Sequence, residues 1–427
     1  MEGSRASNLR LKKMFDFLKK SVWSFTSVVV RSLSSILINK IFAVQFGTAG
    51  ITLLAHFQNL ISIITQIPND GINRGIIRYW SGDELNFNEK QKLLVAGFLF
   101  NIILFLILAI IIVLLQNYFL REFNIELRIS TFLILLFSGI LLYLIHLFLL
   151  SVILSFQKIK VYSVINMIIS ILLLFVIFLI SKRNPLMYTL LALILSQAAG
   201  LIFSVYYVIR KKYISIVKAT LPPEGFSKLG EFVLMALSVL IFGKFTDFII
   251  RDYAIQHFGL HLTGFWQSVV KISDSYMMLF INTVGIVYYP QVSAMIFNTD
   301  QLRVYLQDVL KIVLVVSIVG LSLIYLFREP VLIILFNKDF LPAQELMPFQ
   351  LIGDFFCFIA YLLTYIISAQ ARTRIFILLQ AGSAILYMGL VFLFSTSYGI
   401  EGIPIAHAVR YGLLLLILLI LNKRIIL

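Results

Sequence analysis

The sequence has few charged residues and almost no cysteine. Asp, Glu, Lys and Arg make up only 13% of its 427 residues, whereas 60% are hydrophobic and 14% are aromatic. Soluble globular domains carry about 25% charged residues, so this composition excludes that class of protein. The single cysteine, Cys357, lies inside an apolar run, which excludes a disulfide framework and a thiolate metal site.

The sequence also lacks the short motifs of common enzymes. It has no phosphate-binding P-loop, no zinc-binding HExxH pattern and no nucleophile elbow between a strand and a helix. We therefore expect neither an enzymatic activity nor a cofactor. The net charge of +15 does not indicate a nucleic-acid partner, because the basic residues are scattered through short connections between apolar runs.

Long apolar runs dominate the chain instead. Runs of about 20 residues are long enough to cross a bilayer as helices, whereas a membrane β-barrel shows shorter alternating segments. The sequence therefore predicts an all-α polytopic membrane protein with 12 transmembrane helices. The predicted spans are 22–46, 50–70, 93–115, 131–155, 161–180, 186–208, 231–254, 262–288, 305–326, 345–369, 374–395 and 403–422.

The basic residues outside the spans predict the orientation. With both termini in the cytoplasm, the inner segments hold 22 Lys and Arg residues and the outer loops hold six. Cytoplasmic loops are enriched in Lys and Arg, so both termini are predicted to be cytoplasmic. Residues 1–20 are basic and lack a short apolar core followed by a cleavage site, so we expect a retained cytoplasmic segment rather than a signal peptide.

A weak internal repeat divides the chain near its middle. Residues 43–47 read Ala-Val-Gln-Phe-Gly, and residues 254–259 read Ala-Ile-Gln-His-Phe-Gly. Such repeats are typical of transporters whose substrate site lies between matched bundles. We predict two pseudo-symmetric six-helix lobes, with an N-lobe at 21–209, a cytoplasmic linker at 210–229 and a C-lobe at 230–427.

Seven basic residues lie within the spans, against four acids. A charge at the bilayer centre costs roughly 2.5–3.5 kcal/mol on insertion scales, so these side chains are expected to face a protein interior or a wet cavity. Internal salt bridges that lock helices together are one explanation, but they predict balanced charges. The basic excess favours an anionic ligand, which Arg and Lys bind well.

The predicted site follows from this excess and from the repeat, in which each motif is followed by a glutamine in the next span, Gln58 or Gln267. Lys311 is excluded because it lies near a cytoplasmic helix end, where its side chain can reach the interface. The residues predicted to bind substrate are Arg31, Lys40, Lys244, Arg251, Lys271, Arg410, Gln58 and Gln267. The residues predicted to pair charges or to couple an ion are Asp247, Asp274, Asp354 and His407. No metal site is expected.

Three stretches resemble a known family. Residues 43–47 with Gly50, residues 265–276, and Phe349-Gln-Leu-Ile-Gly-Asp354 are similar to the Wzx-type polysaccharide flippases of the multidrug/oligosaccharidyl-lipid/polysaccharide exporter superfamily. This family includes lipid III (enterobacterial common antigen) and O-antigen flippases. The resemblance implies a V-shaped central cavity with alternating access in the bacterial inner (cytoplasmic) membrane. The implied substrate is an undecaprenyl-pyrophosphate-linked oligosaccharide, moved to the periplasmic leaflet for surface polysaccharide (lipopolysaccharide) biosynthesis.

The match to the family's charges is partial. Arg31, Lys40, Arg251, Asp274 and Asp354 fit the pattern of the family. The residues that depart from the lipid III pattern are Lys244, Asp247 and Lys271, which favours an O-antigen unit as the glycan.

The resemblance also implies partners and leaves alternatives. The expected partners are the lipid-linked substrate and membrane lipids, together with a polysaccharide polymerase and a chain-length regulator, and the protein is expected to be a monomer. Transport could be driven by the membrane potential or by proton or sodium antiport. A multidrug/cation antiporter of the same fold is the main alternative, and a structural or assembly protein held by internal salt bridges is another.

Overall fold

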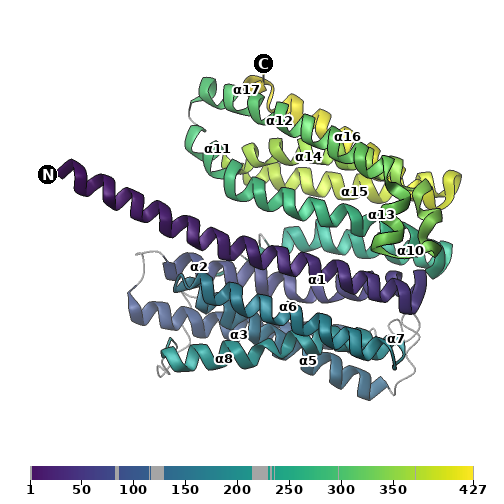
Figure 1. Ribbon diagram of the computed structural model, residues 1–427, viewed down its shortest axis with the longest axis horizontal. Coiled ribbons are helices and arrows are strands. Elements are labelled where there is room, and N and C mark those ends of the chain that lie inside the picture. The colour runs from purple at the N-terminus through teal and green to yellow at the C-terminus, as the bar shows by residue number, and fades with distance from the viewer. Residues whose placement is uncertain are drawn as a thin grey trace. The chain divides into compact units, whose positions relative to one another are not determined.

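In the part of the chain that it describes, the computed structural model consists of helices joined by short turns (Figure 1). The described residues are 2–81, 86–114, 116, 129–213, 229–230, 233–234, 236–296, 298–370 and 372–426. The predicted linker 210–229 therefore lies mostly outside the described residues. The predicted all-α polytopic fold is confirmed.

The chain divides into two compact units. The first contains residues 1–41 and 60–237, and the second contains residues 42–59 and 238–427. The helix α1 (Glu2–Gln66) contributes to both units, so its segment 42–59 belongs with the C-terminal half of the chain. Each unit is described by itself below.

Helices of the first unit pack around an apolar core that includes Ile72, Leu93, Val152 and Ile165. Beyond its share of α1, its elements are the π-helical turn η1 (Ile67–Asn73), α2 (Arg74–Ser81), α3 (Phe87–Leu114), α5 (Ile129–Ser155), α6 (Ile159–Ser181), α7 (Leu186–Ala198) and α8 (Gly200–Lys211).

Helices of the second unit pack around a core that includes Val292, Leu306, Leu363 and Leu418. The helical elements are η2 (Leu240–Phe245), α10 (Thr246–Thr283), η3 (Val284–Tyr288), α11 (Tyr289–Met295), α12 (Thr299–Leu326), α13 (Arg328–Leu335), η4 (Lys338–Glu345), α14 (Met347–Ala369), α15 (Thr373–Tyr398), η5 (Gly399–Glu401), α16 (Gly402–Leu421) and α17 (Lys423–Ile426).

Two glycines with the same unusual backbone conformation divide the longest helices. Gly47 in α1 has φ 63° and ψ −155°, and Gly259 in α10 has φ 75° and ψ 170°. This region of backbone space is essentially restricted to glycine. Both glycines end the repeated Ala-x-Gln motif, so the repeat read in the sequence produces the same sharp bend in each half of the chain.

Two long stretches bring the number of possible membrane crossings closer to the twelve predicted spans. Eight stretches are long and apolar enough to cross a membrane, and two of them, Phe25–Thr65 and Thr373–Leu421, contain 41 and 49 residues. About 20 residues suffice for one crossing, so each of these two can cross twice. The helix α10, bent at Gly259, is not among these eight stretches, although the sequence predicts two spans in its region, 231–254 and 262–288.

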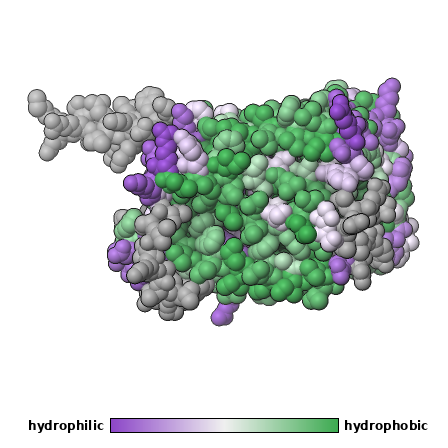
Figure 2. Space-filling view, turned by 90° about the horizontal axis from the view of Figure 1, so that it is seen from below, coloured by the Kyte–Doolittle hydropathy of each residue, from purple (hydrophilic) through white to green (hydrophobic). Residues whose placement is uncertain are grey.

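The surface has the character expected of a membrane protein. In the face shown in Figure 2, hydrophobic side chains form a broad band and hydrophilic residues gather at its two ends. Large apolar side chains are strongly exposed in both units, among them Ile202 at 71% and Leu326 at 69%. Acyl chains of the bilayer can cover such side chains without cost.

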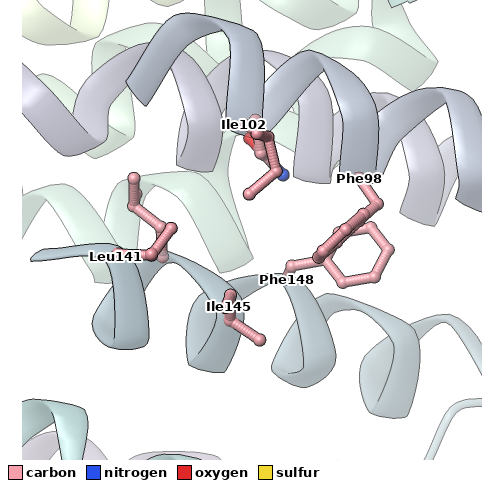
Figure 3. A pocket seen from close by; sticks show the side chains of 7 residues that line it. Phe98, Ile102, Leu141, Ile145 and Phe148 are labelled. Atoms are coloured by element: carbon pink, nitrogen blue, oxygen red, sulfur yellow. The ribbon is translucent and has the colours of Figure 1, made fainter. Parts of the chain in front are cut away.

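A small pocket in the first unit is apolar. Figure 3 shows side chains of α3 and α5 around it, including Phe98, Leu141 and Phe148. The one polar residue in its lining is Asn101, which is 3% exposed. No charged residue of the predicted site contributes to this pocket, so it is not the anion site that the sequence predicts.

Candidate functional site

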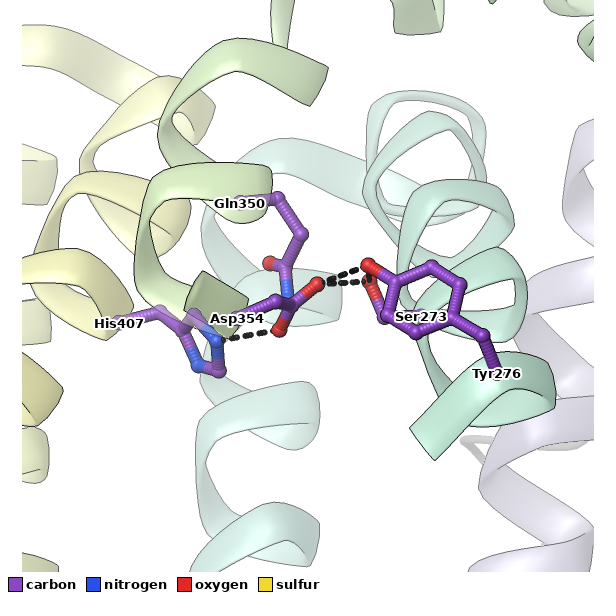
Figure 4. Close-up of polar contacts among 5 residues, drawn as sticks. All are labelled: Ser273, Tyr276, Gln350, Asp354 and His407. Carbon is purple, nitrogen blue, oxygen red and sulfur yellow. Dashed lines mark hydrogen bonds and ion pairs between the residues drawn. The ribbon is translucent and has the colours of Figure 1, made fainter. Parts of the chain in front are cut away.

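A buried carboxylate in the second unit is surrounded by hydrogen-bond donors (Figure 4). Asp354 on α14 is 1% exposed. Its Oδ2 accepts hydrogen bonds from Ser273 Oγ, at 2.6 Å, and from the hydroxyl of Tyr276. Its Oδ1 accepts one from Gln350 Nε2 at 3.3 Å and lies 2.9 Å from His407 Nε2. Three helices thus meet at one carboxylate.

The spacing of these residues explains their convergence. Gln350 and Asp354 are four residues apart on α14, and Ser273 and Tyr276 are three apart on α10, so each pair shares a helical face. The close approach of α16 depends on Gly353, because a Cβ there would collide with the imidazole ring of His407. The glycine therefore permits the contact between His407 and the carboxylate.

This arrangement satisfies the acceptor capacity of a carboxylate. An ionised Asp side chain can accept about four hydrogen bonds, and four donor groups are in place. Burial of a charge is costly unless it is paired and hydrogen-bonded, and both conditions can be met when His407 is protonated. No group of three or more His, Cys, Asp or Glu side chains suited to a metal ion occurs among the described residues.

Two cations on α10 contact neutral oxygens of α1. The buried Arg251 donates from Nη1 to the backbone carbonyl of Ala55 at 3.2 Å. With the Asn59 amide oriented so that its oxygen faces the guanidinium, Oδ1 accepts from the same nitrogen at 2.9 Å. Lys271 Nζ donates to Oε1 of Gln58 at 3.0 Å. All five residues belong to the second unit.

A third cation is held mainly by aromatic rings. Arg410 on α16 donates from Nε to Ser383 Oγ at 2.7 Å. Its guanidinium carbon lies 4.8 Å from the ring centroid of Tyr387 and 4.9 Å from that of Tyr411. Cation–π contacts of this kind stabilise a positive charge and leave part of its hydrogen-bonding capacity unused.

The remaining charges of this region are accessible. Asp247 and Asp274 on α10 are exposed, and Lys244 in the π-helical turn η2 is half-buried. Within the described part of the chain, none of Lys244, Arg251, Lys271 and Arg410 has a carboxylate oxygen within the 4.0 Å that defines an ion pair. Their hydrogen-bond partners, where the structure shows them, are neutral.

Other predicted residues lie elsewhere. Arg31 is exposed and Lys40 is half-buried, and both belong to the part of α1 in the first unit. Gln267 is fully buried in α10, and neither polar atom of its amide has a hydrogen-bond partner in the described structure. All the predicted site residues except Arg31 and Lys40 therefore belong to the second unit, which buries Gln267.

Sequence reasoning missed several residues of this region. Asn59, Ser273 and Ser383 contact Arg251, Asp354 and Arg410, respectively. The spacing of Ser273 and Tyr276 could have shown that they share a helical face. Their partner is about 80 residues further along the chain, and no local pattern in the sequence identifies it.

Comparison with known proteins identifies sequence relatives of the chain. No protein-family model matches the sequence. The chain is 23% identical over 401 residues to the lipid III flippase of Escherichia coli (strain K12), a match that covers 92% of this chain and 95% of that protein. A lipid III flippase from Shigella flexneri matches with the same identity and coverage. The resemblance to polysaccharide flippases read from the motifs is thereby confirmed.

Solved transporter structures share the architecture. An inward-facing multidrug resistance MATE family transporter of the MOP superfamily superposes with a TM-score of 0.74 at 14% identity, over 93% of each chain. The lipid II flippase MurJ in an inward closed conformation gives a TM-score of 0.71 at 15% identity, over 95% of this chain and 87% of that one. The chain therefore has the fold of these transporters.

Proposed function

We propose that the chain is a flippase that moves an undecaprenyl-pyrophosphate-linked oligosaccharide from the cytoplasmic to the periplasmic leaflet by alternating access. One observation supports this more than any other: among the residues that the structure describes, Arg251, Lys271 and Arg410 are hydrogen-bonded to neutral groups and not to carboxylates. Cations held in this way keep their charge available for an anion. The similarity to lipid III flippases agrees with a lipid-linked glycan as the substrate.

The pyrophosphate linker is the part of the substrate that these cations fit. An Arg guanidinium can bind phosphate oxygens with two parallel hydrogen bonds, and a Lys ammonium acts as a mobile point charge. Arg251 has a buried Nε without a hydrogen-bond partner in the described structure, so its fork is only partly used. The proposed substrate-binding set remains Arg31, Lys40, Lys244, Arg251, Lys271, Arg410, Gln58 and Gln267. We place the protein in the bacterial inner membrane with both termini in the cytoplasm. Its substrate serves the synthesis of surface polysaccharide.

Two sources of energy can set the direction of substrate transport: the membrane potential, and the coupled movement of a proton or a sodium ion. Moving one negative charge outward across an inside-negative membrane is favourable by about 2.3 kcal/mol per 100 mV. We assign the competing role, proton or sodium coupling, to Asp354 and His407, because the buried carboxylate and the half-buried imidazole lie 2.9 Å apart. Asp247 and Asp274 lie one helical turn from Arg251 and Lys271 and are proposed to balance these cations when the site is empty.

A multidrug/cation antiporter is the second candidate. The structural likeness to MATE transporters and the exposed carboxylates of Asp247 and Asp274 favour it. Such a transporter is expected to bind cationic drugs through these acids, so Asp247→Asn and Asp274→Asn should abolish drug resistance. The flippase hypothesis predicts instead that neutralising Arg251, Lys271 or Arg410 stops transport.

Complementation tests the proposal. The gene is expressed in a strain that lacks its own O-antigen or lipid III flippase, and surface polysaccharide is scored on immunoblots. Restored polysaccharide with the natural chain, and its loss with Lys271→Gln and Arg410→Gln at equal protein abundance, is the expected result. Drug resistance without polysaccharide would instead identify an antiporter.

A further inference from the structure

The cations of α10 and the residues 55–59 of α1 form a contact that an anion can take apart. We propose that a phosphate or pyrophosphate group replaces the neutral oxygens of Ala55, Gln58 and Asn59 on Arg251 and Lys271, and that this exchange releases α1 from α10. This inference rests on the proposed function and names a step in it. We call the contact among these five residues the latch.

The latch uses two cations on successive halves of a bent helix. Arg251 precedes the bend at Gly259 and Lys271 follows it, yet both reach the same turn of α1. Arg251 contacts Ala55 and Asn59, while Lys271 contacts Gln58. Release of α1 therefore requires both cations to find other acceptors.

The acceptors in the latch are weak for such donors. Ala55 offers a backbone carbonyl within a helix, and Gln58 and Asn59 offer amide oxygens, so none carries a formal charge. A phosphate oxygen carries a negative charge, so its hydrogen bond to a cation adds a Coulomb attraction that a neutral amide or carbonyl oxygen does not provide. A phosphate group reaching Lys271 or Arg251 is therefore a better acceptor than the group already present.

Accessibility differs between the two cations and sets an order of events. Lys271 is half-buried and its partner Gln58 is exposed, so an anion can reach the ammonium group first. Arg251 is only 8% exposed, and its Nε has no hydrogen-bond partner in the described structure. This nitrogen can donate a hydrogen bond only when a further acceptor reaches it. The geometry thus favours binding at Lys271 first, followed by exchange at Arg251.

Two contacts beside the latch must part in the same movement. Thr52 Oγ1 donates to the carbonyl of Leu260 at 2.8 Å. Gly264 lies so close to the backbone of Thr48 that no Cβ could be placed there. Neither contact involves a charged group, so an anion does not stabilise or weaken them directly, and the latch alone is sensitive to it.

Cross-linking across this contact measures the release. Thr52→Cys combined with Leu260→Cys places one thiol on each of the two residues that this hydrogen bond joins, and the native Cys357 is 3% exposed and protected. The rate of disulfide formation in proteoliposomes is measured with inorganic pyrophosphate or with chloride at equal ionic strength. Pyrophosphate is expected to slow cross-linking by about threefold or more, because it shifts the population toward the released state. Flipping should stop in the oxidised protein and return on reduction.

Matched variants assign the response to the latch. Gln58→Glu gives Lys271 a charged partner, so pyrophosphate should no longer slow cross-linking and flipping should fall. Gln45→Glu makes the same change at an exposed position of α1 outside the latch, and both properties should be retained. If the double-cysteine variant does not fold, spin labels at Val44 and Leu262, which are 53% and 41% exposed, should move apart when pyrophosphate is added.

The outcomes separate the latch from the proposed function. If pyrophosphate binds and flipping is normal but the cross-linking rate does not change with pyrophosphate, the proposed release of the latch is wrong and the flippase function still stands. Full flipping by the oxidised double-cysteine protein would do the same. If the protein neither binds pyrophosphate nor flips lipid, both the proposed release of the latch and the proposed flippase function are wrong.

Discussion

The hydroxyl of Tyr276 is predicted to stabilise the buried carboxylate of Asp354 by a measurable amount. Tyr276→Phe removes one of four donors and retains the ring, which packs against Phe358 with 6.0 Å between centroids. A hydrogen bond to a charged group contributes about 1.5–3 kcal/mol. Ser273 still donates to the same oxygen, so we expect a loss near the lower end, about 1.5–2 kcal/mol.

Reversible unfolding in detergent micelles measures this loss, and a matched variant controls for it. Tyr398 is 57% exposed at the end of α15, so Tyr398→Phe should change the free energy of unfolding by less than about 0.5 kcal/mol. A double-mutant cycle of Tyr276→Phe with Asp354→Asn should give a coupling energy of about 1 kcal/mol or more. A Tyr276→Phe variant as stable as Tyr398→Phe, with a coupling energy below about 0.5 kcal/mol, would refute this account of the network.

Three further predictions concern single positions. Gly259→Ala forces a backbone conformation that other residues avoid and should lower stability by about 1–3 kcal/mol, whereas Gly320→Ala, in open space on α12, should be neutral or stabilising in the same unfolding assay. Gly353→Ala should cost about 1–3 kcal/mol, because its Cβ meets the His407 ring, and a stable variant would contradict the packing. Lys271→Gln should keep the fold while flipping in vesicles falls roughly tenfold or more, and an unchanged rate would remove Lys271 from the site.

Much of the fold could be read from the sequence, because the signals that specify it are local. Apolar runs of about 20 residues predict spans wherever they occur. The repeated motif before Gly47 and Gly259 predicted matched halves, and both glycines adopt the same bend. The π-helical turns η1, η2 and η3 were not predicted, since no residue pattern distinguishes a π-helical turn from an α-helix in an apolar span.

The site was less predictable, because its contacts join distant parts of the chain. Charge and position alone identified Lys271, Arg251 and Asp354 as unusual within the membrane. Their actual partners are Gln58, Asn59 and Ser273, and each lies about 80 to 210 residues away along the chain. Gln58 was predicted as a site residue, but nothing in the sequence pairs it with Lys271, and Asn59 and Ser273 give no signal until helix packing brings them beside a charge.

Selective binding of a phosphate-bearing lipid tests the central claim most directly. Purified protein in nanodiscs is titrated with undecaprenyl pyrophosphate and with undecaprenol, which has the same tail and no phosphate, and bound lipid is counted by native mass spectrometry. We predict a preference for the pyrophosphate of about tenfold or more, equivalent to about 1.4 kcal/mol, that declines in Lys271→Gln and Arg410→Gln. Equal binding of the two lipids by the natural chain would contradict the claim that these cations recognise an anionic linker.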